Sequence, residues 1–590
     1  MEPYALPQPV AADPGADSSG PARLWARHHL LGLDAVVLLI VGLALFWGLG
    51  SAPIRDTDEA LYAAIALSMA HGGSWLMPHL DGVPYIEKPP LLYWLMALSF
   101  KAIGVGAWQA RLPDALAAWM TSFGCMVFGR MLAAPVAGRF AALLTGTALG
   151  YVLIARTILF DPLMVFFWLI ALAMVTLAVQ RRQRFWLRAA AVAVALATLT
   201  KGPVALLLLG LIAVVQLLFA PGTWKRGALL RFYLDPWAVA IFLLVAAPWH
   251  LAAMEAQHGF AWFYFFNETI GRFLGTRIPD DFHHGPWWYY GPKLLIGFFQ
   301  WAPWVVVLAW FGPRLNDSKS ATLSARWGRN AAIVLTLFYS SAGDKGAYYL
   351  LPVIPLVAWW LGVKLQQAME QSDQAAAALP ARLGLAAAAF GVAAVALWAA
   401  TFTPQLHRDL LHSGLPSADT AWLLPMIAGL ALTSLAGAVL LRSAKLHMGM
   451  AVFALSALVM VQFSVRLAEA KTADLSQKQV AADMLRELPP HTRWFSWQTF
   501  EDHDASLLLY GVNHLQIVDS TSKDLWFGCQ QARQSTCVTP QVLLQARDKG
   551  LPVAVWVARD RLPGWLRSGL SKGLSSKAFK NSVVYYSRGD

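Results

Sequence analysis

Long apolar runs separated by short polar segments dominate the pattern along this chain. Thirteen of these runs, three of them short, approach the roughly 20 apolar residues that a helix needs to cross the hydrocarbon core of a bilayer. In chain order they cover 30–50, 112–131, 137–155, 162–180, 186–200, 203–220, 236–253, 293–312, 329–342, 350–366, 383–402, 421–441 and 446–465. The pattern therefore predicts an α-helical polytopic membrane protein with about thirteen transmembrane helices.

A further apolar run at 91–105 is short and contains Lys101. Suppose that the segment with Arg23 and Arg27 is cytoplasmic and that 91–105 lies along the interface. Every later basic cluster between spans then also falls on the cytoplasmic side, as the preference of Lys and Arg for that side requires. Counting 91–105 as a crossing would place all of those clusters outside. We therefore predict that residues 51–111 form a first outer loop with interfacial helices.

Polarity divides the chain into three parts. Residues 1–29 are polar and rich in Pro, Gly and Ala, which predicts a disordered cytoplasmic tail before a transmembrane domain at 30–466. From 467 to 590 the hydrophobicity falls to ordinary values, and the stretch 552–560 is typical of a strand in a small α/β domain. The predicted outer segments are then the first outer loop, the turn at Asp161, the loops 254–292 and 343–349, and this C-terminal domain.

Composition agrees with a membrane protein. Hydrophobic residues make up 57% of the chain and charged residues only 14%, against about 25% in soluble domains. The net charge of +12 sits in short clusters between apolar runs, so membrane orientation explains it and no nucleic-acid partner is expected. Cys529 and Cys537 lie in the polar C-terminal part. If that part is outside the cytoplasm, its environment permits a disulfide between them.

The first outer loop concentrates ionisable residues close to the membrane. Asp58 and Glu59 begin a helix-compatible run, and Glu87 and Lys88 come directly before two prolines. Ionisable groups near hydrocarbon are costly, so they indicate a functional site, although solvated interfacial charges are the simpler alternative. An acid and a cation in one loop suit a substrate that carries both a sugar and a phosphate.

Three further outer segments carry candidate chemistry. Asp161 begins a helix, where it either caps the helix or joins Asp58 on the same face. The loop 254–292 holds twelve aromatic residues around Arg272, which stands among apolar residues and therefore suggests an anionic partner. The loop 343–349 offers Lys345 and Tyr349. Together, Lys88, Arg272, Lys345 and Tyr349 predict an outer-face anion site built from three loops.

Several motifs, taken together, resemble the ArnT-type aminoarabinose transferases of the GT-C superfamily, with protein O-mannosyltransferases as more distant relatives. The resemblance covers about residues 30 to 370. Its motifs are D-E-x-x-Y (Asp58, Glu59, Tyr62), G-x-x-Y-x-E-K-P-P (Gly82, Tyr85, Glu87, Lys88), R-L-P (Arg111), D-P (Asp161), R-F-L (Arg272) and K-x-x-x-Y-x-L-P (Lys345, Tyr349). One departure is Leu61, which stands where the aminoarabinose enzymes usually have arginine. This departure leaves the sugar and the acceptor open.

The resemblance implies a GT-C fold with thirteen spans, interfacial helices in the first outer loop and a C-terminal periplasmic domain. It also implies an undecaprenyl phosphate-linked sugar donor, attack at the anomeric carbon and release of undecaprenyl phosphate. The residue roles that it implies are catalytic for Asp58, Asp161 and Glu59, binding of the carrier phosphate for Lys88, Arg272, Tyr349 and Lys345, and other substrate contacts for Tyr62, Tyr85 and Glu87.

The expected function is therefore transfer of a sugar, 4-amino-4-deoxy-L-arabinose, from undecaprenyl phosphate to lipid A at the periplasmic face of a bacterial inner membrane. One alternative is a related enzyme that glycosylates another lipid, a glycan or a protein. Another is a lipid-linked sugar flippase, which should instead carry its sites near the bilayer midplane, with broken helices and inverted repeats. Membrane lipids are expected partners. No cofactor is required, although His283 and His284 leave a divalent metal as an alternative.

Overall fold

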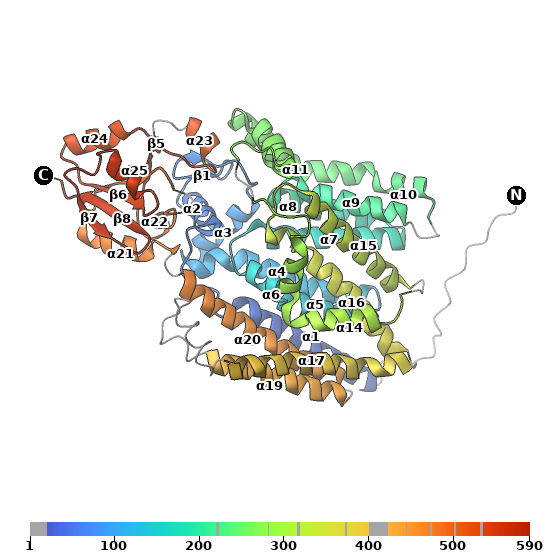
Figure 1. Ribbon diagram of the computed structural model, residues 1–590. Coiled ribbons are helices and arrows are strands. Elements are labelled where there is room, and N and C mark those ends of the chain that lie inside the picture. The colour runs from blue at the N-terminus through green and yellow to red at the C-terminus, as the bar shows by residue number, and fades with distance from the viewer. Residues whose placement is uncertain are drawn as a thin grey trace.

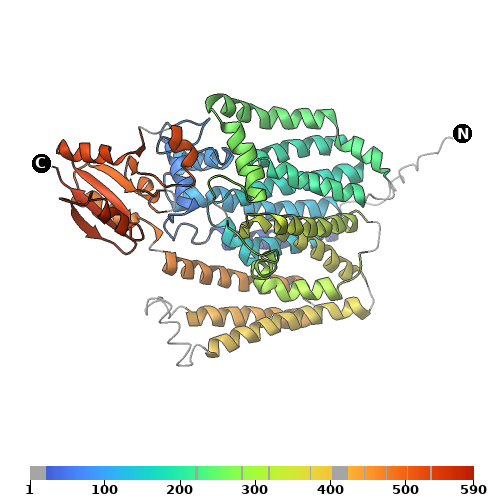
Figure 2. The ribbon, with the colours of Figure 1, turned by 45° about the horizontal axis from the view of Figure 1, so that its top comes forward.

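The computed structural model describes residues 21–219, 224–280, 283–315, 319–371, 374–400, 423–443, 445–472, 475–500, 503–531 and 535–589. Helices form a bundle, and a domain with a β-sheet lies at one end of it, beside the helices of the first outer loop (Figures 1 and 2). The first helix, α1, covers Pro21–Phe46 and so begins before the predicted boundary at residue 30. The rest of the predicted tail, residues 1–20, lies outside the described residues.

Each of the thirteen apolar runs coincides with helix within the described residues. After α1 these helices are α4 (Ala107–Met131), α5 (Pro135–Thr147) with α6 (Leu149–Ala155), α7 (Phe160–Arg181), α8 (Arg184–Lys201), α9 (Val204–Leu218), α11 (Pro236–Ala256) preceded by α10 (Arg226–Tyr233), α13 (Tyr290–Phe298) with α14 (Ala302–Phe311), α15 (Ser320–Ser341), α16 (Val353–Glu370), α17 (Gln374–Ala400), α19 (Leu423–Arg442) and α20 (Leu446–Thr472). The prediction of a polytopic α-helical protein is therefore confirmed.

Length and composition alone identify fewer crossings than thirteen. Among the described residues, seven helical segments are long and apolar enough to span a membrane, or eight if α5 and α6, bent by 62°, count as one. The chain is a multi-pass membrane protein, and thirteen crossings stay a prediction. The run at 91–105 forms α3 (Leu91–Ile103), whose 13 residues extend only about 20 Å, too short for a perpendicular crossing.

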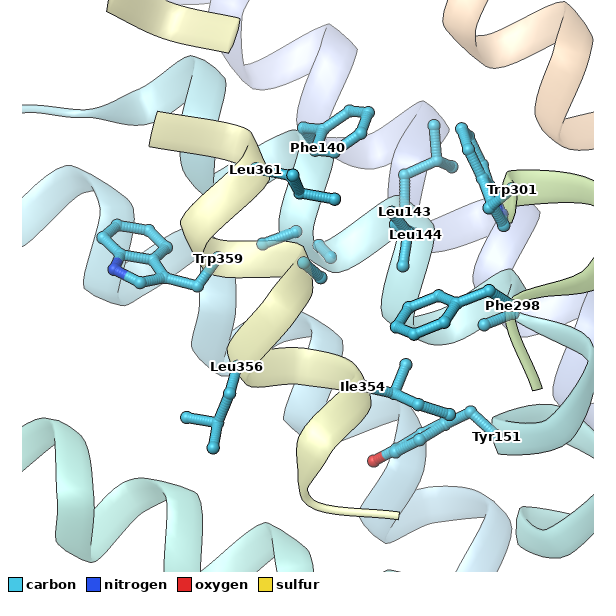
Figure 3. Packing of buried hydrophobic residues seen from close by; sticks show 14 of the residues in the cluster. Phe140, Leu143, Leu144, Tyr151, Phe298, Trp301, Ile354, Leu356, Trp359 and Leu361 are labelled. Carbon is cyan, nitrogen blue, oxygen red and sulfur yellow. The ribbon is translucent and has the colours of Figure 1, made fainter. Parts of the chain in front are cut away.

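Small residues let helices of the bundle approach closely. A Cβ at Gly129 would meet the Cα of Gly138 at 2.7 Å, and a Cβ at Gly362 would meet the carbonyl oxygen of Ala137 at 2.6 Å. Such contacts join α5 to α4 and α16, as is common where helices pack in lipid. Figure 3 shows the large side chains that fill the space between these helices, among them Phe140 of α5.

The C-terminal domain is α/β, as predicted. The elements of this domain are α21 (Lys478–Glu487), β3 (Arg493–Trp497), α22 (Ser506–Leu509), β4 (Leu515–Val518), α23 (Trp526–Gln531), β5 (Cys537–Val538), α24 (Pro540–Asp548), β6 (Val553–Ala558), α25 (Leu562–Arg567), β7 (Ser575–Ala578) and β8 (Ser582–Ser587). Its six-stranded sheet has the order β5-β4-β3-β6-β8-β7, parallel from β5 to β6 and antiparallel from β6 to β7. The predicted strand in 552–560 is β6.

The first outer loop and the C-terminal domain share one hydrophobic core. The loop contains α2 (Asp58–Ala70), β1 (His79–Leu80), β2 (Val83–Pro84) and α3. Apolar residues of α2 and α3 pack in the same cluster as residues of α21, β3, β4 and β6, including Ile65, Met96, Met484, Trp494 and Trp556. The loop is therefore held in place by the far end of the chain.

Buried polar contacts fix this junction. The Asp56 carboxylate accepts hydrogen bonds from the amide and the hydroxyl of Ser506, both at 2.6 Å. Asp81 accepts from the amide of Leu515 at 2.7 Å and contacts His514 at 2.8 Å. Each loop acid thus meets the start of an element of the C-terminal domain.

Burial makes this junction sensitive to pH. Burial raises the pKa of the Asp56 carboxyl to about 8 from 3.8, against the opposing effect of its hydrogen bonds to Ser506. Because the folded-state pKa is raised, the stabilisation is fully present below about pH 4 and is lost as the pH rises through about 8. We expect the melting temperature in detergent to fall from pH 5 to pH 9, and to fall less in Asp56→Asn. An equal slope in both proteins would contradict this expectation.

Candidate functional site

A cavity of about 540 Å³ lies where the first outer loop, the ends of several helices of the bundle and the C-terminal domain meet. All five predicted outer segments contribute to its walls, the C-terminal domain through Asp524. Its ionisable and phenolic lining residues are Asp58, Tyr62, Tyr85, Glu87, Lys88, Asp161, Lys201, Tyr264, Glu268, Arg272, His283, Tyr339, Asp344, Tyr348, Tyr349 and Asp524. Most of the residues that the motifs singled out therefore meet at one place.

Asp58 is the first residue of α2, and the Thr57 side chain caps this helix by accepting from the Glu59 amide. The carboxylate of Asp58 lines the cavity and is half-buried. Among the described residues, it makes no side-chain hydrogen bond to another side chain or to the backbone. Its oxygens are therefore available to a substrate.

Asp161 forms an ion pair that the sequence did not predict. It lies in the first turn of α7, whose N-cap is Leu159, so the interpretation of Asp161 as a helix cap is wrong. Both of its carboxylate oxygens lie 2.6 Å from Nζ of Lys201, at the end of α8. Lys201 also lies 4.9 Å and 5.0 Å from the ring centroids of Tyr348 and Tyr349. One signal could have revealed this pair: Lys201 lies between the predicted spans 186–200 and 203–220, where the alternation of spans places it outside, against the usual preference of basic residues for the inside.

The sequence suggested that Arg272 stands isolated among apolar residues, but in the structure it contacts two carboxylates. It begins α12 (Arg272–Leu274), directly after a π-helix at Trp262–Gly271. Its guanidinium lies 3.0 Å from Glu268, one helical turn earlier, and 3.2 Å from Asp344. Burial alone would raise the pKa of the Asp344 carboxyl, but a hydrogen bond from Tyr349 and the charge of Arg272 hold it below its usual value.

Lys88 is the least firmly paired of the cavity cations. Its Nζ lies 3.5 Å from Glu87 and 3.9 Å from Glu268, and 18% of its side chain is exposed. By contrast, the contacts of Lys201 and Arg272 with carboxylates are shorter. Lys88 can therefore turn toward an anionic ligand while Glu87 and Glu268 keep it beside the cavity.

Two predicted site residues lie outside the cavity lining. Nζ of Lys345 donates to the carbonyls of Ser340 and Ala342, at 2.8 and 2.9 Å, and so satisfies the end of α15. Glu59 points away from the neighbouring Asp58, because successive helical residues do not share a face. Lys345 therefore lies apart from the predicted anion site, and Glu59 apart from Asp58.

Glu59 has a structural environment. Its carboxylate accepts two hydrogen bonds from Arg111, at 2.9 and 3.0 Å, and another from Arg55. Although burial alone would raise the pKa of Glu59, these two arginines lower it to about 2. A carboxylate so firmly ionised and paired anchors α2 rather than exchanging protons.

The remaining predictions concern cross-links and metals. Cys529 and Cys537 form a disulfide, which joins α23 to β5. In the described part of the chain, no three His, Cys, Asp or Glu side chains gather as metal ligands would. His283 lines the cavity, and its backbone amide donates to Asp344 at 3.0 Å. That no metal is required stays a prediction.

Comparison with known sequences points to transferases that use polyprenyl phosphates. The family of dolichyl-phosphate-mannose-protein mannosyltransferases matches residues 87–251. Undecaprenyl phosphate-alpha-4-amino-4-deoxy-L-arabinose arabinosyl transferase 2 of Pseudomonas fluorescens (strain Pf0-1) is 29% identical over 62% of this chain and 64% of that protein. The corresponding transferase of Pseudomonas paraeruginosa (strain DSM 24068 / PA7) is 30% identical over 61% of this chain and 64% of its own length. The chain thus spans slightly less than two thirds of these relatives.

Comparison with solved structures shows the fold. ArnT from Cupriavidus metallidurans bound to undecaprenyl phosphate matches with a TM-score of 0.75 at 23% identity, over 95% of this chain and 98% of that one. The apo form of the same protein matches with a TM-score of 0.76 at 22% identity. The predicted GT-C fold and the resemblance to the ArnT type are therefore confirmed.

Proposed function

Because this chain has the fold of the ArnT-type transferases and resembles them in sequence, we propose that it is a polyprenyl-phosphate-sugar-dependent glycosyltransferase. Its donor is undecaprenyl phosphate-linked 4-amino-4-deoxy-L-arabinose, and its acceptor is lipid A. The reaction takes place at the periplasmic face of the bacterial inner membrane, where the first outer loop and the C-terminal domain lie. The disulfide Cys529–Cys537 supports this side, since such bonds persist in oxidising compartments.

One observation carries the proposal: a single cavity holds three cations, Lys88, Lys201 and Arg272, together with the available carboxylate of Asp58. In a donor of this class, a phosphodiester joins the lipid to the anomeric carbon of the sugar. As the bond between the anomeric carbon and the phosphate oxygen breaks, negative charge grows on the departing lipid phosphate. Lys88 and Arg272 stabilise this charge, and Tyr349 adds a hydroxyl at the same wall.

The role of Asp58 depends on the acceptor. For an acceptor hydroxyl, Asp58 removes the proton as the oxygen attacks the anomeric carbon. For a lipid A phosphate the nucleophile is already anionic, so Asp58 instead orients the sugar or binds its amine. Asp161 is held by Lys201 and supports the same wall, so its own contribution is to fix the position of that lysine.

Tyr62, Tyr85 and Glu87 line the cavity beside these groups. The hydroxyl of Tyr85 donates to Glu87 at 3.1 Å, and the two rings of Tyr62 and Tyr85 meet edge to face at 6.4 Å. Aromatic faces of this kind pack well against the apolar face of a sugar or an isoprene unit. We assign Tyr62 and Tyr85 to contacts with the donor, and Glu87 to holding the cations that face it. We propose that no cofactor takes part.

A second candidate function is glycosylation of another acceptor. The match of residues 87–251 to the protein mannosyltransferase family supports it, because that match covers Lys88, Asp161 and Lys201 without distinguishing the acceptor. In this candidate the carrier-phosphate site is the same. Only the acceptor differs.

Reconstitution separates the candidates. Purified protein in liposomes receives radiolabelled undecaprenyl phosphate-aminoarabinose with lipid A, or with a peptide acceptor. A labelled lipid A product supports the proposed function, and a labelled peptide supports the second candidate. Movement of unchanged donor between leaflets, with no new covalent product, would show a flippase and contradict both.

A further inference from the structure

Behind the cavity wall, the side chain of Arg277 is completely buried. Its Nη2 lies 2.5 Å from Oε1 of Glu87, and its Nε contacts Oε1 of Glu268. One guanidinium therefore joins the first outer loop to the π-helix of the loop 254–292. The segment that carries it is itself fixed, because the Asn267 side chain makes hydrogen bonds to both the amide and the carbonyl of Ile278.

The two carboxylates use their other oxygens in the opposite direction. Oε2 of Glu87 lies 3.5 Å from Lys88 and 3.9 Å from Arg272. Oε2 of Glu268 lies 3.0 Å from Arg272 and 3.9 Å from Lys88. Charge therefore alternates in layers from the interior to the cavity: Arg277, then the two glutamates, then Lys88 and Arg272.

Two buried carboxylates that share one site repel each other, and without compensation one of them takes up a proton. Burial and the neighbouring Glu268 raise the pKa of Glu87, and the cations Arg277, Lys88 and Arg272 oppose this rise. A protonated glutamate would hold Lys88 and Arg272 less firmly. Among the three cations, Arg277 opposes the rise in the pKa of Glu87 most strongly, so it favours the ionised carboxylate that holds the front layer.

We propose that Arg277 is a positioning residue, which keeps Glu87 and Glu268 ionised and aligned so that they present Lys88 and Arg272 to the donor phosphate. The inference rests on the proposed transferase function. The ionisable groups in contact with this cluster include Tyr85, which donates to Glu87, Asp344, which contacts Arg272, and Asp524 of the C-terminal domain, 3.8 Å from Arg277. Charges also act on it from Tyr62, Tyr93, Lys201 and Tyr349.

The test measures donor KM and kcat between pH 6 and pH 9 for the full-length protein, with radiolabelled undecaprenyl phosphate-aminoarabinose and lipid A. In Arg277→Gln we expect donor KM to rise about tenfold or more at neutral pH, since a charged buried hydrogen bond is lost on each glutamate. The rise should grow as the pH falls, because Glu87, whose pKa is raised by burial and by Glu268, then takes up a proton and holds Lys88 and Arg272 less firmly. Arg277→Lys keeps the charge but cannot bind both carboxylates, so its donor KM should lie between those of the wild type and Arg277→Gln.

Arg188→Gln is the matched control. It removes an arginine that contacts Asp235 at 3.2 Å, thirteen residues and so about 20 Å along α8 from Lys201. We expect its donor KM to show the wild-type pH profile. A wild-type donor KM in Arg277→Gln, or a KM raised by the same factor at every pH, would overturn the inference and leave Arg277 as a packing residue.

If Arg277→Gln does not fold, Arg277→Lys carries the test alone: a KM that rises as the pH falls supports the inference, and a wild-type profile overturns it. Failure of the wild-type protein to transfer the sugar at any pH would overturn the proposed function itself. The two failures are therefore distinguishable.

Discussion

Asp58→Asn is expected to lower the transfer rate about 100-fold or more, whether the carboxylate acts as a base or orients the sugar. The carboxylate lines the cavity without a hydrogen-bonded partner among the described residues, so the substitution removes charge from the substrate side only. Turnover of radiolabelled donor by purified protein measures the effect. The same preparation should retain its melting temperature and its expression level, because no fold contact of Asp58 is lost.

The adjacent acid offers a contrast within the same helix. Glu59→Gln breaks a buried pair with Arg111, and losing one partner of such a pair costs about 3–5 kcal/mol. We expect this variant to lower the melting temperature and the yield, while the folded fraction keeps most of its rate per molecule. A normal rate in Asp58→Asn, with a lost rate in stable Glu59→Gln, would reverse the two assignments.

Lys88→Gln is expected to raise donor KM about 10- to 100-fold, with a smaller fall in kcat. The lysine is held by two long contacts, 3.5 and 3.9 Å, and so has the most to gain from an incoming phosphate. Initial rates at varied donor concentration separate the two parameters. Because the interaction is between charges in a half-buried site, the KM difference should shrink as ionic strength rises.

Lys101→Gln is the matched control for Lys88→Gln. Lys101 belongs to the same first outer loop, but it is exposed near the end of α3, 5.6 Å from the ring centroid of Trp75 and outside the cavity lining. Its substitution should leave donor KM unchanged. Equal effects of the two substitutions would point to general attraction of the anionic lipid by the loop rather than to a phosphate site.

The period and length of the apolar runs were enough to predict the bundle, because a chain in lipid must satisfy its backbone in helices. The short run that forms α3 was separated from the crossings by charge alone. Of the C-terminal sheet, the sequence pattern predicted a single strand, β6. It could not predict that this sheet packs on α2 and α3, because a contact between segments some 400 residues apart produces no periodicity in the sequence.

The candidate site was predictable where a motif placed an acid or a cation at a helix end, as with Asp58, Lys88 and Arg272. Partners separated in the chain were not, so Lys201 was missed as the partner of Asp161 and Arg277 as the partner of Glu87. Glu268 was missed although it lies only four residues before Arg272, because no helix was predicted there to bring the two side chains together. Lys345 shows the opposite error: the residue has suitable chemistry, but its ammonium binds backbone carbonyls instead of facing the cavity. Local sequence gives the type of a side chain, whereas the direction in which it points depends on the backbone conformation and on the partners nearby.

The contact between Asp56 and Ser506 joins positions 450 residues apart. At about 5–20 residues per second, a ribosome needs roughly 20–90 s to make the chain between them. During that time α2 has left the ribosome without the partner that covers its apolar side. The first outer loop therefore remains incomplete until the last part of the chain has been made and packs against it. Any factor that shields exposed apolar surface has that interval in which to act.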